Sequence, residues 1–578
     1  MQENNNNTSP DFEIQQVSVD DGDDIVAQDI VGEKADIQPK PFYKMPKFII
    51  GVVIVVAVLA AIIAFAVSSS NSDNGKKAAA NSGTADVVTN DDGKNALKIG
   101  NTEISVGMYN CYYSQVVSQY LYYADKGYYT IDKTKDYSQQ KTTDSKGNET
   151  TWADLFVQDT ITQLKRTVAL YEAAQKSGLT ITDSQQKLID RTLADIKSAA
   201  EKEGVDLSTY IQNNYGEGCT YSVLNEVYKQ NYLAEAYYER LVIGTSSTDD
   251  EIEKYFSSHK DECTGVDLSY IQIGFESDST DAENSAQKCV EKINSQNSLD
   301  EKKSKLKSLI PDVCSKSIKN YVSSGYFETE KDAERYIVNS ADTSLKKTDT
   351  TLVSDGINWL FSSDTKVGSC KYFVDKDNSV VFVILKTGKA EVLNDTVYSV
   401  RHMLFKAESK SDSNTVTKKA INAAEKRADS VLSQFESTDK TELSFAILAD
   451  ENSDDEKTIS SGSYGVFGGL LGGIKKGEYP TEFDEWVTDS SRKKGDVAKV
   501  YVKNSYTGYH LIYFIGSQKE YQFICADALN NEKVTSKMNT IVDGAKTIKY
   551  QNGMNNTQTA KPESTTAATQ STTNNKAN

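Results

Sequence analysis

The chain is poor in the residues that bind metals, with three histidines and seven cysteines in 578 residues. The cysteines form no Cys-x-x-Cys pair, and the two nearest in sequence, Cys289 and Cys314, have no histidine close by. Because a structural zinc site needs several such ligands at short spacing, a zinc site is disfavoured and no cofactor is expected. The odd number of cysteines leaves at least one thiol unpaired, and their pairing cannot be read from the sequence.

The chain also lacks a basic stripe. Its net charge is −19, and charged residues make up 25% of it. Nucleic-acid binding needs clustered Lys and Arg to neutralise phosphates, so we expect no nucleic-acid partner. The length allows several domains, since one domain takes roughly 100–200 residues.

One long run without any charge stands out at 48–68, FIIGVVIVVAVLAAIIAFAVS. Its length suits a helix that crosses a bilayer, for which about 20 residues are needed. Lys40, Lys44 and Lys47 precede it, which by the positive-inside rule places the N-terminus in the cytoplasm and the rest outside. A cleaved signal peptide is the alternative, but its apolar region should span only about 7–15 residues.

The remaining segments divide by composition. Residues 1–47 are predicted to be a disordered cytoplasmic tail and 69–94 a flexible linker. Folded regions are expected at 95–262, 263–392 and 393–520, followed by a C-terminal segment at 521–552 and a disordered, Thr- and Asn-rich end at 553–578.

Helical signals dominate from about 152 to 260. An apolar stripe from Val157 to Tyr171 predicts a helix that stops at Gly178. Capping boxes, in which a Thr and a residue three positions later cap a helix start, are predicted at Thr182 and Thr248. His259, just after the second of these helices, is interpreted as a solvated helix-end residue.

After residue 265 short strands appear, and a pattern occurs twice. LSYIQIGF (268–275) aligns with YSVRHMLF (398–405), and Trp is followed by Gly nine residues later in both copies. Two α/β domains in tandem are therefore predicted. In this alignment Gln272 stands where the second copy has His402, and Phe382 stands where it has His510. A core role would not explain why both histidines are absent from the first copy, so a function is favoured for the pair.

The second copy resembles the parvulin family of peptidyl-prolyl cis/trans isomerases. The resemblance rests on VRHMLF, FAILADENSDD (445–455), SGSYGVF (461–467), GEYPTEF (477–483), KKGDV and TGYHLI (507–512), in order and at family spacing over about 398–516. The whole layout is similar to extracytoplasmic foldases of the PrsA and SurA type. It implies an α+β chain in which a helical, chaperone-like domain precedes two parvulin-like domains, the first degenerate, each with a four-stranded antiparallel sheet and surrounding helices.

The resemblance implies the site residues of the second copy. His402 and His510 fall on the paired active-site histidines, Asp455 on a position held by Cys or Asp, and Thr507 on a small hydroxyl residue. The expected wall of the proline slot is formed by aromatic residues: Tyr464, Phe467, Tyr479 and Phe483. Asp454 remains an alternative to Asp455. Tyr479 replaces the usual Met, Pro480 stands where Gln is common, and the loop 468–476 is unusually rich in glycine.

These features predict a foldase anchored in a cell membrane of the Gram-positive bacterial type. Its partners would be unfolded or newly secreted polypeptides with X-Pro bonds. A non-catalytic peptide-binding chaperone or cell-surface protein is the main alternative, and an adhesin or wall scaffold is a weaker one. The retained His402, His510 and Asp455 favour the enzyme.

Overall fold

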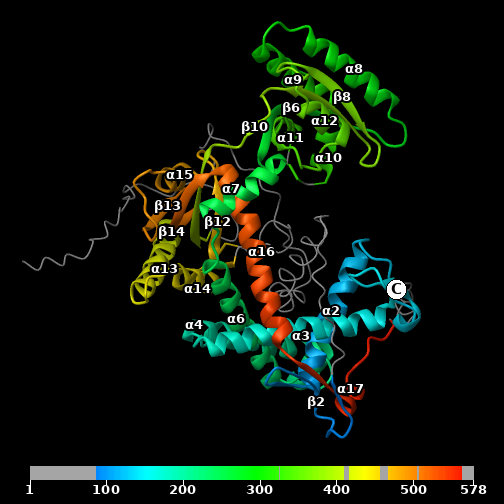
Figure 1. The fold of residues 1–578 in the computed structure, drawn as a ribbon, viewed down its shortest axis with the longest axis vertical. Coiled ribbons are helices and arrows are strands. Elements are labelled where there is room, and N and C mark those ends of the chain that lie inside the picture. The colour runs from blue at the N-terminus through cyan, green and yellow to red at the C-terminus, as the bar shows by residue number, and fades with distance from the viewer. Residues whose placement is uncertain are drawn as a thin grey trace, which may run out of the picture.

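The computed structural model describes residues 86–324, 326–327, 329–408, 416–455, 467–503 and 507–562. The predicted membrane segment 48–68 and the tail before it lie outside these residues. Among the helices that the structure describes, none is long and apolar enough to cross a bilayer. The described chain forms a helical lobe and two α/β lobes, which Figure 1 shows in blue to green, in green, and in yellow to orange.

Helices with one buried apolar face build the helical lobe. They are α2 (Val106–Asp125), α3 (Trp152–Lys176), α4 (Asp183–Glu203), α5 (Leu207–Tyr215), α6 (Tyr221–Ile243) and the short η1 (Tyr137–Gln139), with a hairpin of β4 (Lys141–Thr143) and β5 (Glu149–Thr151). The stripe before Gly178 lies on α3 as predicted. Thr182 and Thr248 both form the predicted capping boxes, on α4 and on α7 (Asp249–Ser258), and His259 is the C-cap residue of α7.

The two ends of the described chain meet in one sheet beside these helices. Its strand order is β1 (Asp86–Val88), β15 (Thr547–Tyr550), β2 (Asn95–Ile99) and β3 (Thr102–Ser105). Two predicted boundaries are therefore wrong: strand β1 lies within the expected linker 69–94, and the expected disordered end at 553–578 begins too early. Helix α17 (Gln551–Asn555) buries Gly553, and Ala560 N donates to Tyr113 Oη at 3.0 Å.

The second lobe begins after the short helix η2 (Lys260–Cys263). Its sheet holds β6 (Thr264–Gly274), β7 (Asp342–Lys346), β8 (Cys370–Asp375), β9 (Val380–Lys386) and β10 (Glu391–Val392). The helices are α8 (Thr280–Asn294), α9 (Leu299–Val313), α10 (Ser315–Ser323), α11 (Glu330–Asn339) and, between β7 and β8, α12 (Ser354–Phe361). The strand β6 pairs with β7 and β9, and β9 pairs with β8, all antiparallel.

The third lobe repeats this topology. It holds β11 (Thr396–Lys406), α13 (Lys418–Glu436), α14 (Glu442–Asn452), η4 (Phe467–Gly469), β12 (Leu470–Ile474), α15 (Thr481–Val487), β13 (Val497–Val502) and β14 (Gly508–Lys519). Its antiparallel sheet has the order β12-β11-β14-β13, which corresponds to β7-β6-β9-β8 of the second lobe. The predicted fold class, a helical region followed by two related α+β units, is confirmed. The sheet of the second lobe has five strands rather than the predicted four, because β10 pairs with β6.

The strand register corrects one predicted correspondence between the copies. Gly368 N bonds to Lys386 O, and Gly495 N bonds in the same way to Phe514 O, which makes Phe382 the counterpart of His510 as predicted. Across the sheet, however, Phe382 pairs with Gln272, whereas His510 pairs with Leu404. The residue that corresponds to His402 is therefore Tyr270, two positions before Gln272. The first copy still lacks both histidines. The other domain limits stay predictions.

Candidate active site

The two central strands of the third lobe bring the two strand histidines together. In the antiparallel pair β11–β14, His402 lies opposite Ile512 and His510 opposite Leu404, so the histidines are diagonal neighbours on one face of the sheet. His402 Nε2 and His510 Nδ1 are 2.7 Å apart, within hydrogen-bond distance, and the rings stack at 4.8 Å between centroids. Both are buried, with 7% and 9% of their surfaces exposed. We call these two residues the histidine pair.

An aromatic wall borders the histidine pair. Phe483 on α15 is buried, and its ring centroid lies 5.6 Å from that of His402 and 5.8 Å from that of His510, edge to face in both cases. Tyr479, just before α15, stacks on Phe483 at 5.0 Å and is half-buried. The structure thus places these two predicted wall residues beside the histidine pair.

Two neighbouring aspartates at the end of α14 have different surroundings. Asp455 Oδ2 is 3.7 Å from His402 Nδ1, which is too long for a hydrogen bond, and its side chain is 61% exposed. Asp454 binds Arg427 through both carboxylate oxygens at 2.7 Å and accepts from Lys406 N. Of the two candidates, Asp455 is therefore the one that faces the histidine pair.

The remaining predicted site residues are Thr507, Tyr464 and Phe467. Thr507 precedes β14, is half-buried, and its carbonyl accepts from Ala407 N at 2.9 Å. Tyr464 lies outside the described residues, and Phe467 begins η4 without a described side chain.

A glycine turn lies against the backbone of His402. Gly468 and Gly469 have φ of 62° and 66°, a left-handed conformation that glycine adopts without strain. A Cβ on Gly469 would lie 2.0 Å from His402 O, so no side chain fits there. This explains why glycine stands at 469: the turn approaches the histidine strand at backbone distance. Gly472 and Gly473 of the same loop lie against the ring of Phe523 instead.

The neighbour of His402 joins the third lobe to the helical lobe, which the sequence analysis did not foresee. Arg401 is 1% exposed, and its guanidinium contacts Glu239 of α6 at 3.2 Å, Glu442 of α14 at 3.3 Å and Gly468 O at 3.4 Å. Alternation along β11 makes Arg401 point to the opposite face from His402. We call Arg401, Glu239 and Glu442 the interlobe ion cluster.

Burial keeps both imidazoles neutral. It lowers the pKa of His510 to about 4. Burial, and secondly the adjacent His510, hold the pKa of His402 well below its usual value. His510 Nε2 is buried and has no hydrogen-bond partner among the described residues. An unsatisfied buried polar atom is costly, and such atoms in native structures call for a functional or structural reason.

Comparison with known proteins supports the resemblance in this lobe. Residues 402–516 match the family model described as "Rotamase: PPIC-type PPIASE domain". This part of the chain is a parvulin-type domain. One similar solved structure is the crystal structure of foldase protein PrsA from Streptococcus pneumoniae str. Canada MDR_19A, at 15% identity, with 54% of this chain and 92% of that chain covered and a TM-score of 0.20. No curated protein sequence matches the chain.

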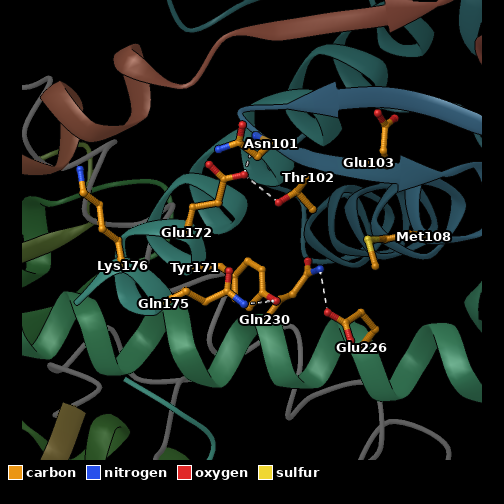
Figure 2. A pocket seen from close by; sticks show the side chains of 10 residues that line it. All are labelled: Asn101, Thr102, Glu103, Met108, Tyr171, Glu172, Gln175, Lys176, Glu226 and Gln230. Carbon is orange, nitrogen blue, oxygen red and sulfur yellow. Dashed lines mark hydrogen bonds between the residues drawn. The ribbon is translucent and has the colours of Figure 1, made fainter. Parts of the chain in front are cut away.

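A hollow of about 500 Å³ lies away from the histidine pair, in the helical lobe between the β2–β3 turn, α3 and α6 (Figure 2). Its wall is polar. Glu172 accepts from Asn101 N at 2.7 Å and from Thr102 Oγ1 at 2.8 Å, and Gln230 Nε2 donates to Glu226 at 3.2 Å. Met108 and Tyr171 are the only large apolar side chains among the described residues of this lining, and no imidazole lies there, so the parvulin-type domain is the better candidate for prolyl chemistry.

Proposed function

We propose that this chain is a peptidyl-prolyl cis/trans isomerase and foldase that acts on unfolded or newly secreted polypeptides outside the cytoplasmic membrane. The observation that carries the proposal is the 2.7 Å contact between His402 and His510 beside Phe483, within a parvulin-type domain. The apolar run 48–68, preceded by lysines, supports a membrane anchor.

The chemistry of the reaction suits this site. Rotation about an X–Pro bond is slow because amide resonance sets a barrier of about 18–20 kcal/mol. Lowering it requires neither a nucleophile nor a metal, but an apolar surface for the ring and polar groups placed for the twisted amide. Phe483 and Tyr479 offer the surface, and the histidine pair offers the polar groups.

Asp455 sets which nitrogens of the histidine pair carry protons. Its carboxylate, 3.7 Å from His402 Nδ1, favours a proton on that nitrogen. Nε2 of His402 then accepts from His510 Nδ1–H, which leaves an unshared lone pair on His510 Nε2. In this arrangement neither ring can change its protonation without affecting the other, so the two act as one unit.

The test uses the full chain and a proline-containing peptide. His402→Ala, His510→Ala and the double variant are compared for isomerisation rate, after circular dichroism has shown that each is folded. Each single variant should lose activity by about 100-fold or more, and the double variant should lose little further, because residues that act as a unit are non-additive. His259→Ala, the third histidine, serves as the matched control and should keep full activity. Full activity in the folded double variant would rule out the catalytic role.

The membrane anchor is tested separately. Deleting 48–68 should move the protein from the membrane to the soluble fraction without changing the isomerisation rate. A protein that stays at the membrane after the deletion would contradict the proposed anchor.

The second lobe lacks the side chains that form this site in the third lobe. Tyr270 and Phe382 occupy the positions of the two histidines, and Gly356 on α12 occupies that of Phe483, by the spacing that aligns Trp359 with Trp486. Leu352 fills the space above Gly356, since a Cβ there would lie 3.0 Å from its side chain. We therefore propose that the second lobe contributes no isomerase activity. The His402→Ala, His510→Ala variant, in which the second lobe is intact, tests this as well.

A further inference from the structure

The cysteines, scattered along the sequence, gather in space. All seven are buried. Cys111 and Cys219 form a hydrogen-bonded pair in the core of the helical lobe, and Cys289, Cys314 and Cys370 share the core of the second lobe. The remaining two, Cys263 and Cys525, are 262 residues apart in sequence, yet their sulfur atoms are separated by 3.3 Å.

Cys263 and Cys525 lie where the lobes are joined. Cys263 ends η2, at the entrance to the second lobe, and Cys525 lies in the first turns of α16 (Glu520–Gly544), directly after β14. Leu393 lies at the exit of the second lobe. Its backbone N donates to Cys263 O at 2.9 Å, and its backbone O accepts from Tyr521 N at 2.8 Å. Three passages of the chain thus cross at one point, which we call the junction.

The junction also connects both α/β lobes to the helical lobe. Figure 1 shows α16 running from the third lobe towards the helical lobe, with α7 beside its upper part. Lys533 on α16 pairs with Glu251 on α7 at 2.7 Å, and Tyr521 Oη donates to Glu253 at 2.9 Å. Both thiols are fully buried in the apolar cluster between these helices. A covalent bond here would fix the point from which the second lobe projects.

We propose that Cys263 and Cys525 are a disulfide-forming pair that closes the junction when the chain meets a disulfide oxidant, such as an oxidised small thiol or a protein disulfide. The thiolate of one cysteine attacks the oxidant's disulfide and releases one thiolate. The second cysteine then attacks the mixed disulfide and releases the other. Two cysteine thiols are oxidised, one oxidant disulfide is reduced to two thiols, and two protons leave the cysteines.

The geometry is close to that of the product. A disulfide needs about 2.0 Å between sulfurs, so the two atoms must approach by about 1.3 Å, a distance within reach of side-chain rotation. Burial raises the pKa of Cys263 and raises that of Cys525 to about 12. Thiolate is the attacking species, so exchange in the folded protein is slow and the bond forms chiefly while the chain folds or the junction opens.

Trypsin separates all seven cysteines, which makes the pairing measurable. Cys263 lies alone in the peptide 261–288, and Cys525 lies alone in 520–533. The full chain, in mild detergent, is refolded with reduced and oxidised glutathione, alkylated, digested without reductant and examined by mass spectrometry. The same map is made on native protein held with oxidised glutathione at pH 9, so that the result does not depend on refolding yield.

The expected product is 261–288 linked to 520–533, lost on reduction. The link should be absent from Cys263→Ser and from Cys525→Ser, and present in Cys370→Ser, which removes a thiol of another group. Amide exchange across 249–263 and 520–530 should slow by about tenfold in the oxidised protein. The proposal is overturned if both peptides carry glutathione or the alkylating reagent instead of each other, or if either is linked to another cysteine. It is independent of isomerase activity.

Discussion

In the interlobe ion cluster, we expect Glu239→Gln to destabilise the protein when Arg401 is present and to be neutral or stabilising when Arg401 is replaced. The guanidinium of Arg401 lies among two carboxylates from different lobes, and all three side chains are less than a tenth exposed. Breaking a buried ion pair by removing one partner costs about 3–5 kcal/mol, because the other charge is left without compensation. Arg401→Met takes this cation from Glu239, whereas Glu442 keeps Lys494, whose Nζ lies 3.2 Å from it. We therefore expect a loss of about 3–5 kcal/mol in the free energy of unfolding, chiefly from Glu239.

Glu239→Gln is the milder change. The amide keeps an oxygen that can accept from the guanidinium, and Glu442 still balances its charge, so we expect a loss of about 1–2 kcal/mol. In the Arg401→Met background the same change should be neutral or stabilising, because it removes a buried carboxylate that has lost its cation. The difference between the two backgrounds is the coupling energy of the pair.

The assay follows the fluorescence of Trp486 during urea unfolding. The chain has three tryptophans, and Trp152 and Trp359 lie in the other lobes, so both are replaced by Phe in every variant. The free energies of unfolding of the parent, the two single variants and the double variant are then compared, provided that all four have the same slope against urea concentration. If Glu239→Gln costs as much in the Arg401→Met background as in the wild type, Glu239 and Arg401 do not act as a pair, and the helical lobe is not tied to the histidine strand through them.

Four further results are expected. Burial lowers the pKa of His510 to about 4, whereas an unfolded histidine titrates near about 6.5. The unfolded chain therefore binds the proton first as pH falls, so the stability is complete above about pH 6.5 and His510 alone should lower it by about 3 kcal/mol by pH 4. The lowered pKa of His402 adds to this loss, which urea unfolding across that range measures. The kcat/KM of the folded protein should stay level from pH 8 to about 5; a decline centred near 6.5 would contradict the lowered pKa. Phe483→Leu, which keeps an apolar side chain but removes the ring beside the histidine pair, should raise KM for a proline peptide by about tenfold with folding intact by circular dichroism; an unchanged KM would remove Phe483 from the slot. Gly469→Ala should destabilise the domain by about 1–3 kcal/mol and reduce activity, because its φ is positive and its Cβ would meet His402 O; wild-type thermal unfolding and activity would contradict the tight turn.

Local signals predicted the elements well. The capping boxes at Thr182 and Thr248 depend on residues within a few positions of one another, so the sequence contains all that determines them. The histidine pair was also predictable, because two polar rings in apolar strands need partners and the family motifs place them on adjacent strands. Its 2.7 Å contact agrees with that expectation.

The register of the second lobe could not be read in the same way. Side chains alternate between faces with a period of two, so Tyr270 and Gln272 both lie on the face of β6 that corresponds to His402. A slip of one residue would move apolar side chains to the wrong face, but a slip of two preserves the pattern. The correspondence was decided by pairing with β9, which joins residues more than a hundred positions apart.

Long-range contacts between lobes left no local signal either. Arg401 and Glu239 are 162 residues apart and Cys263 and Cys525 are 262 apart. Each residue has a common solvent-exposed or core interpretation when taken alone. The return of β15 to the strands β1 and β2 likewise depends on the path of α16 across the molecule.

The two α/β lobes show how one sheet can hold either a site or a core. In the third lobe the face of β11 and β14 next to α15 carries two imidazoles against Phe483, and one ring nitrogen is left without a partner among the described residues. In the second lobe the corresponding face is an apolar cluster in which Phe382 packs with Leu352 and Leu360. Phe382 in place of His510 removes the cost of an unsatisfied buried nitrogen, so the second lobe packs an apolar core where the third keeps a polar site. The third lobe keeps the energetic cost of the unsatisfied His510 Nε2, which is expected if the proposed function of the histidine pair depends on that nitrogen.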